Sequence, residues 1–151
     1  MHESIPQSSL PDSVPPTTIL VVDDTPQNIK VLGELLKHDY HIRAANSGER
    51  ALHAANSDPR PDLILLDVMM PDMSGFEVAQ HLKANPKTAD IPIIFLTALN
   101  STTDIVKGFQ VGANDFISKP FNKEELIIRV THQISLVAAK RIILNKTEEL
   151  Q

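Results

Sequence analysis

Cysteine is absent from the 151-residue chain, which excludes disulfide bonds, thiolate metal sites and a cysteine nucleophile. A basic stripe is also missing, and the formal charge of −5 argues against a nucleic-acid-binding surface. No apolar run reaches the roughly 18 residues that a membrane span needs, and no signal peptide is visible. These absences favour a cytoplasmic protein that binds neither nucleic acid nor membrane.

Two other groups of motifs are missing. The five glycines never form a dinucleotide-binding G-x-G-x-x-G pattern or a phosphate-binding loop, so nucleotide binding has no support. The six histidines are scattered and form no H-E-x-x-H zinc motif. Any metal site is therefore expected to use carboxylate oxygens.

Proline and serine dominate residues 1–17, which contain few large apolar side chains. This composition opposes regular structure and predicts a disordered leader. From Thr18 onward, apolar runs alternate with segments in which apolar residues recur every three or four positions, and Thr25-Pro26, Ser47 and Asn122 are expected to open helices. The predicted strands are residues 18–22, 41–45, 63–66, 91–97 and 115–118.

The alternation of five strands with five helices predicts the fold class. The strands are mostly continuous apolar runs, as expected when helices cover both faces of a sheet. We therefore predict an α/β protein with a five-stranded parallel sheet and right-handed crossovers. In such sheets, functional sites form beyond the carboxyl ends of the strands.

Polar residues stand at those strand ends. Asp23 and Asp24 follow the first strand, Asp67 follows the third, Thr97 ends the fourth and Lys119 follows the fifth. Three neighbouring carboxylates repel one another unless a cation lies among them, and Mg²⁺ prefers such oxygen ligands. An ionised Asp67 could then act as a nucleophile toward a phosphoryl group, whose charge the metal and the Lys119 and Thr97 side chains would share.

This set of residues resembles the receiver domain of two-component response regulators, the CheY-like superfamily. The resemblance extends over about residues 17–132 and implies a doubly wound, flavodoxin-like (βα)5 fold with an extended C-terminal helix. We assign residues 18–134 to the receiver domain. The matching segments are Asp23-Asp24, L-L-D-V-M-M-P-D-M-S-G around Asp67, Thr97, G-A-N-D-F from Gly112, and Lys119-Pro120-Phe121.

The resemblance implies that Asp67 accepts a phosphoryl group from the phosphohistidine of a sensor histidine kinase. It also implies Mg²⁺, with Mn²⁺ as a substitute, bound by Asp24, by Asp23 mainly through water, by Asp67 and by the backbone carbonyl of Met69. Thr97 would contact the phosphoryl group.

Lys119 would also contact the phosphoryl group, and the resemblance implies a cis peptide bond between Lys119 and Pro120. Thr97 and Phe116 would form the conformational switch. Because Phe116 has no hydroxyl, any switch there depends on packing alone. The side chains of Met69 and Leu99 would flank the phosphate, and we hypothesise that they restrict the access of hydrolytic water.

Two flanking acids have simpler interpretations. Asp62 follows Pro61 and precedes the third strand, so it is expected to be a solvated residue. Asp72 lies in M-P-D-M-S-G, a turn context that favours aspartate for local reasons.

The apolar spacing of the last helix continues past the expected end of the domain, interrupted by Arg141. Packing on the sheet is expected up to about Ile134. Residues 135–151 are interpreted as a helical extension that either continues this packing or forms a coiled-coil connector to an output domain outside this sequence. The resemblance implies outputs such as cyclic-di-GMP enzymes or kinases, and a chain ending within a helix favours a fragment of a longer protein.

A homodimer is a further expectation, through this C-terminal helix or through the face of the fourth helix, fifth strand and fifth helix. The candidate residues on that face are Lys107, Asp115, Glu125 and Arg129.

Two alternatives stay open. A Mg²⁺-dependent phosphatase could use the same aspartyl nucleophile, but that class carries a second acid two residues later, where this chain has Met69. A phosphorylation-independent binding module would not need the complete set of acids, hydroxyl and lysine. We therefore expect no enzymatic activity beyond phosphorylation and dephosphorylation of Asp67 itself.

Overall fold

The computed structural model describes residues 17–98 and 102–149, with side chains as far as Arg141. The predicted leader therefore falls outside the described residues, apart from Thr17. Strands and helices alternate through the chain: β1 (Thr18–Val22), α1 (Pro26–Leu36), β2 (His41–Ala45), α2 (Gly48–Ala55), β3 (Leu63–Asp67), α3 (Gly75–Ala84), β4 (Ile93–Thr97), α4 (Thr102–Gln110), β5 (Asp115–Ser118) and α5 (Lys123–Glu149).

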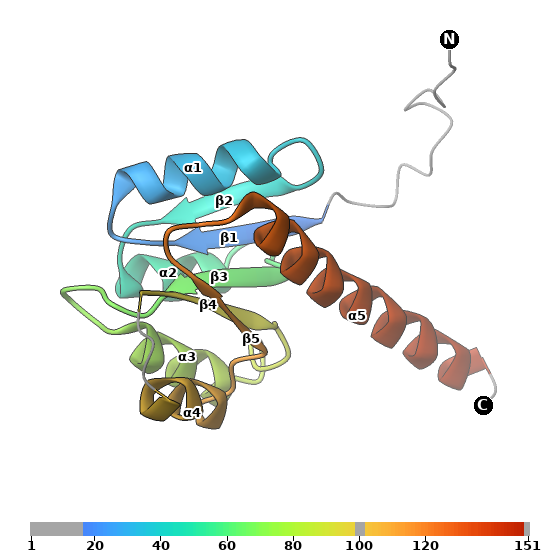
Figure 1. Cartoon of the computed structure of the whole chain (residues 1–151). Helices are drawn as coiled ribbons and strands as arrows, with labels where there is room; N and C mark the ends of the chain where they lie inside the picture. The colour runs from blue at the N-terminus through green and yellow to red at the C-terminus, as the bar shows by residue number, and fades with distance from the viewer. Residues whose placement is uncertain (1–16, 99–101, 150–151) are drawn as a thin grey trace, which may run out of the picture.

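All five strands pair in parallel in the order β2-β1-β3-β4-β5, which confirms the predicted sheet (Figure 1). The register aligns the carboxyl ends: Val22 pairs with Leu66, and Asp67 with Leu96. The strand order reverses between β1 and β3, because the chain passes from β1 to β2 and then back across to β3. Ligand sites of open α/β sheets form at such a reversal.

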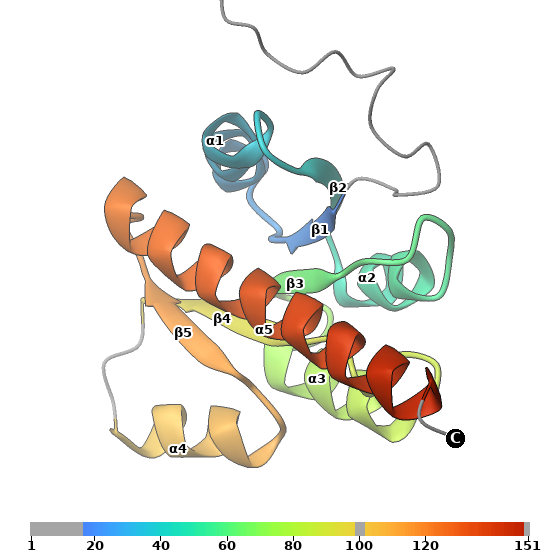
Figure 2. The ribbon, with the colours of Figure 1, turned by 90° about the vertical axis from the view of Figure 1, so that its right-hand side faces the viewer.

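Helices cover both faces of the sheet, and Figure 2 shows α1 and α2 on opposite sides of β1. Alternate strand residues point to opposite faces. Leu20, Ile64 and Phe95 pack with α2 and α3 on one face. Ile19 and Leu65 pack with α1 and the first half of α5 on the other. The three central strands are therefore fully buried, as their continuous apolar sequences predict.

Local sequence sets the helix starts. Ser47 accepts a hydrogen bond from the Arg50 N–H at 3.2 Å, and Asn122 accepts one from the Glu125 N–H at 2.9 Å. Both are N-terminal caps that satisfy otherwise unpaired backbone donors. Thr25 occupies the cap position of α1, but its side chain makes no capping hydrogen bond. These helices start where the sequence predicts.

The predicted fourth strand was two residues too long at its start. Pro92 has no N–H to donate to a neighbouring strand, and the Ile91 N–H donates to the Thr88 carbonyl at 3.1 Å. The strand begins at Ile93.

The last helix differs from the other four in length. α5 has 27 residues, begins near the carboxyl ends of the strands and runs back past the edge where the strands begin (Figure 1). None of the described helices has an apolar stretch long enough to cross a membrane.

Candidate functional site

Asp67 ends the central strand and is 2% exposed. Its Oδ1 accepts hydrogen bonds from the Lys119 amine at 3.0 Å and from the Met69 N–H at 3.2 Å. Burial raises the pKa of Asp67 to about 6, against an ordinary value of 3.8. The hydrogen bond from Lys119 opposes this rise, and the negative charge of Asp23 adds to it.

Asp23 is fully buried directly after β1. Its Oδ1 accepts the Thr25 N–H at 2.9 Å, and its Oδ2 accepts the Asn28 side-chain amide at 3.1 Å. Asp24, by contrast, is exposed. One carboxylate oxygen from each of Asp23, Asp24 and Asp67 lies within 4.8 Å of the others, so the predicted acids do come together.

Lys119 joins the two buried acids. Its amine lies 3.2 Å from Asp23 Oδ2 and 3.0 Å from Asp67 Oδ1. Burial lowers the pKa of Lys119, but the hydrogen bond and charge of Asp67, together with those of Asp23, outweigh this effect, so the pKa ends above its usual value. Lys119 is therefore a fixed positive charge beside the carboxylate that ends β3.

The donor set suits a hard divalent cation. All three acidic side chains offer oxygen, and no histidine or cysteine belongs to the group. When all three acids are ionised, Lys119 neutralises one of their three negative charges. The remaining two negative charges match the charge of one divalent cation. Mg²⁺ commonly binds through one or two carboxylates plus water, and the exposed Asp24 provides a side of the group open to solvent. The residues present therefore fit a magnesium ion.

A family model described as the response regulator receiver domain matches residues 19–131. The chain belongs to this receiver family. Over 134 residues, this receiver is 42% identical to a Vibrio cholerae protein named "Probable cyclic di-GMP phosphodiesterase", covering 89% of the chain and 30% of the relative. It is 44% identical over 113 residues to response regulator PleD of Caulobacter vibrioides, covering 74% of the chain and 25% of the relative. The receiver thus spans less than a third of the length of these two relatives.

Solved structures agree with this assignment. A response regulator from Chloroflexus aurantiacus has a TM-score of 0.75 and 34% identity, and the match covers 80% of this receiver and 99% of that chain. The chemotaxis protein CheY4 of Vibrio cholerae has a TM-score of 0.74 and 31% identity, covering 78% and 98%. Fold and family are therefore those of CheY-like receivers.

Thr97 and Phe116 lie on neighbouring strands of this receiver. Thr97 ends β4 and is 4% exposed, one residue beyond the partner of Asp67 in the strand register. The Phe116 ring packs between those of Phe95 and Phe109, with centroid distances of 5.6 and 5.0 Å. α4 can pack close to the Phe116 ring because Gly108 lies at the contact. A Cβ added at Gly108 would lie 2.4 Å from that ring.

Several other predicted residues also have defined places. The peptide bond between Lys119 and Pro120 is cis. The Met69 side chain is 65% exposed, and Asp72 is exposed as expected of a turn residue. Leu99, the other apolar residue expected beside a phosphate, lies outside the described residues.

The interpretation of Asp62 as a solvated residue was wrong. Its side chain is 16% exposed, accepts the Thr18 N–H at 2.8 Å and pairs with Arg141 at 2.6 Å. Asp62 therefore holds the start of β1 through Thr18 and contacts α5 through Arg141, a residue far away in the sequence.

Sequence reasoning missed Asn28. Its amide donates to Asp23 because α1 begins at Pro26, which places residue 28 in the first helical turn above the end of β1. An amide side chain in the first turn after an acidic strand end is the signal that could have identified it.

The candidate dimer residues divide into two groups. Arg129 pairs with Asp115 at 2.8 Å and with Glu125 at 3.3 Å. The Lys107 amine instead lies 4.8 Å from the centroid of the Phe76 ring. Three of the four thus form one ion-pair cluster between β5 and α5.

Proposed function

We propose that this receiver is a phosphoacceptor switch in which Asp67 takes a phosphoryl group from the phosphohistidine of a sensor histidine kinase. The observation that carries the proposal is the arrangement around Asp67: a buried carboxylate at the end of the central strand, bonded to Lys119 and grouped with two further acids. The phosphorylated state would control a partner or an attached output domain.

The proposed reaction is a single displacement at phosphorus. A carboxylate oxygen of Asp67 attacks, the bond between phosphorus and the imidazole nitrogen breaks, and the imidazole leaves with its electron pair. A pKa of about 6 leaves most Asp67 side chains ionised and nucleophilic at neutral pH. Because Lys119 and the Met69 N–H both bond Oδ1, they orient the carboxylate so that Oδ2 is the attacking atom.

The residues proposed to hold Mg²⁺, or Mn²⁺ in its place, are Asp23, Asp24, Asp67 and the backbone carbonyl of Met69. When bound, the ion supplies positive charge that offsets the charge of the acids and of the transferring group. Lys119 contributes a second, fixed positive charge. The Thr97 hydroxyl at the adjacent strand end donates to a phosphoryl oxygen.

The switch is proposed to act through Thr97 and Phe116. A phosphoryl group that draws Thr97 toward Asp67 changes the space next to Phe116, whose ring packs between Phe95 and Phe109. Because Phe116 makes only apolar contacts through its ring, the two states differ in packing around α4. The signal is then a shift in population between these states.

Output is proposed to lie outside residues 18–134. The longer relatives include the protein named for cyclic di-GMP phosphodiesterase activity and a phosphate regulon transcriptional regulatory protein from Pseudomonas aeruginosa. We propose that residues 135–151 connect this receiver to such a domain. A homodimer would form through the extension or through the face that carries Lys107 and Arg129.

Intact-mass measurement tests the proposal. The protein is incubated with Mg²⁺ and a small phosphodonor, acetyl phosphate, and separately with a phosphorylated histidine kinase. One added phosphoryl group is expected, lost in Asp67→Asn and kept in Asp72→Asn, an exposed acid of the following loop. Phosphorylation that survives Asp67→Asn would contradict the proposal. Repeated turnover of a small phosphate ester would instead favour the phosphatase alternative.

A further inference from the structure

The second half of α5 leaves the apolar core before it leaves the sheet. Leu126 and Val130 are fully buried, and Ile134 packs against the same cluster. Beyond Ile134, Val137 alone among the described side chains of α5 is not exposed. Arg141 follows Val137 by four positions and so lies on the same face of the helix. Over the described side chains, the sheet-facing stripe of α5 therefore passes from apolar residues to a cation.

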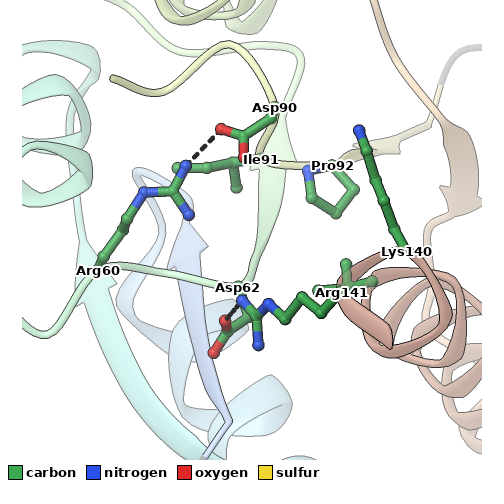
Figure 3. A pocket seen from close by; sticks show the side chains of 8 residues that line it. Arg60, Asp62, Asp90, Ile91, Pro92, Lys140 and Arg141 are labelled. Atoms are coloured by element: carbon green, nitrogen blue, oxygen red, sulfur yellow. Dashed lines mark hydrogen bonds and ion pairs between the residues drawn. The ribbon is translucent and has the colours of Figure 1, made fainter. Parts of the chain in front are cut away.

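Asp62 faces this cation from the edge where β3 begins (Figure 3). Asp62 Oδ1 accepts a hydrogen bond from Arg141 Nη2 at 2.6 Å. Its Oδ2 accepts the Thr18 N–H at 2.8 Å, and its own N–H donates to the Thr18 carbonyl at 2.7 Å. The Asp62 carboxylate thus joins Arg141 of α5 to Thr18, the first residue of β1, and the Asp62 backbone N–H adds a further hydrogen bond to Thr18.

The contact beside this ion pair is loosely packed. A cavity of about 90 Å³ lies there, lined by Ile91 and Pro92 on the sheet side and by Val137 and Lys140 on α5. The Arg60–Asp90 ion pair borders it on the side away from α5 (Figure 3). Among the described side chains of this part of α5, Val137 is the one half-buried apolar residue, and the Arg141–Asp62 pair is the one ion pair to the sheet side.

We propose that the Arg141–Asp62 pair is a releasable latch that fixes the direction in which α5 leaves the domain. With the latch closed, as in this structure, the helix beyond Arg141 has one orientation relative to the sheet. With the latch open, α5 tilts about the point where its core contacts end, near Ile134.

The exposure of the two partners makes the latch releasable. The Arg141 side chain is 60% exposed, so water and salt compete for it, while Asp62 is held at 16% exposure by Thr18. Ion pairs of this kind are weak and salt-sensitive, so modest perturbations shift the balance between closed and open states. The latch needs no phosphoryl chemistry, and its test stands apart from that of the proposed function.

Distance measurement between two spin labels tests the latch. The chain has no cysteine, so Lys30→Cys on α1 and Glu148→Cys on α5 give two unique labelling sites in the full chain. Double electron–electron resonance should give one narrow distance distribution for this labelled parent. Arg141→Gln should broaden or shift it, and so should Asp62→Asn, which keeps an oxygen to accept the Thr18 N–H.

Lys140→Gln is the matched control. This substitution removes a positive charge one position before Arg141, from a residue that lines the same cavity. Lys140 has no hydrogen-bond or ion-pair partner among the described residues. Its distribution should stay narrow. High salt should broaden the distance distribution of the labelled parent but leave that of Arg141→Gln unchanged. The double variant, Asp62→Asn with Arg141→Gln, should give the same distribution as either single variant.

Three results would overturn the latch. The first is the same distribution in parent and Arg141→Gln. The second is a broad distribution already present in the parent at low salt. The third is equal broadening by Lys140→Gln, which would indicate a general effect of charge. Helix content measured by circular dichroism should not change among the variants, so that a broader distance distribution reports a tilt of α5 and not its unravelling.

Discussion

Replacing Asp67 by asparagine is expected to stabilise the metal-free protein at neutral pH, although it removes the proposed phosphoacceptor. Burial of the carboxylate raises its pKa to about 6, and Lys119 offsets this only in part. Above that pH, the folded protein holds a charge that the unfolded chain accommodates more easily. Asparagine has nearly the same shape, carries no charge and keeps an oxygen to accept hydrogen bonds from Lys119 and Met69.

The size and sign of the effect follow from linkage. Between pH 3.8 and about 6, the folded state binds more protons at Asp67 than the unfolded state does. The stability of the parent relative to Asp67→Asn is therefore greatest below pH 3.8, falls through this window and levels off above it. The full difference in pKa converts to roughly 3 kcal/mol, and we expect about 1–3 kcal/mol in favour of the variant at neutral pH.

Urea denaturation in the presence of a chelator, at a series of values from about pH 4 to about pH 8, measures this difference. Asp72→Asn serves as the control, because an exposed carboxylate should change stability little at any of these values. Added Mg²⁺ should narrow the gap, since an ion that binds only the folded parent stabilises it. A gap that does not vary with pH, or a parent more stable than Asp67→Asn at neutral pH, would refute the reasoning.

Three further predictions concern packing and charge, each measured as the free energy of unfolding in urea. Leu126→Ala should lower it by about 2–5 kcal/mol, because it opens a cavity at a fully buried side chain; a smaller loss would mean that α5 packs loosely there. Gly108→Ala should lower it by about 1–3 kcal/mol, since the new Cβ would lie 2.4 Å from Phe116. Phe116→Leu in the same chain should recover part of that loss, and no recovery would place the clash elsewhere. Arg129→Gln should change it by less than about 1 kcal/mol, because its ion pair with Asp115 is partly exposed; a larger loss would show a stronger contact.

Much of the fold could be predicted because the strands are apolar runs separated by helix-starting residues. The predicted start of the fourth strand was wrong because Ile91 and Pro92 continue the apolar run of the strand. That pattern does not report that proline lacks the N–H needed for strand pairing. Periodicity reports burial, whereas strand boundaries depend on which backbone groups can pair.

The grouping of Asp23, Asp24, Asp67 and Lys119 was also predictable, since parallel strands bring their carboxyl ends to one edge. The partners of these residues were harder to find. Asn28 reaches Asp23 because it lies in the first turn of α1, directly after the end of β1. The spacing of apolar residues along the strands does not report this contact.

Asp62 shows a different limit of sequence reasoning. Locally it follows a proline and precedes a strand, which is also where solvated acids are common. Its partner Arg141 is 79 positions away and looks from sequence like an interruption of an apolar seam. The packing of α5 along the sheet brings Asp62 and Arg141 together. The charge of Arg141 within an apolar pattern and the partial burial of Asp62 are then both accounted for by their ion pair.

The length of α5 has a mechanical consequence. At 1.5 Å per residue, its 27 residues form a rod of about 40 Å. Lys119, which bonds Asp67, lies only four positions before the first residue of this rod. A tilt of about ten degrees about Ile134 would carry the far end of the rod through about 4 Å, given the same rise per residue. At the same rise per residue, the part of α5 before Ile134 forms an arm of about 16 Å and the part after it an arm of about 22 Å. As a rigid lever, the helix would therefore enlarge a movement at its strand-end side by about 1.4-fold and carry it to the opposite edge of the sheet.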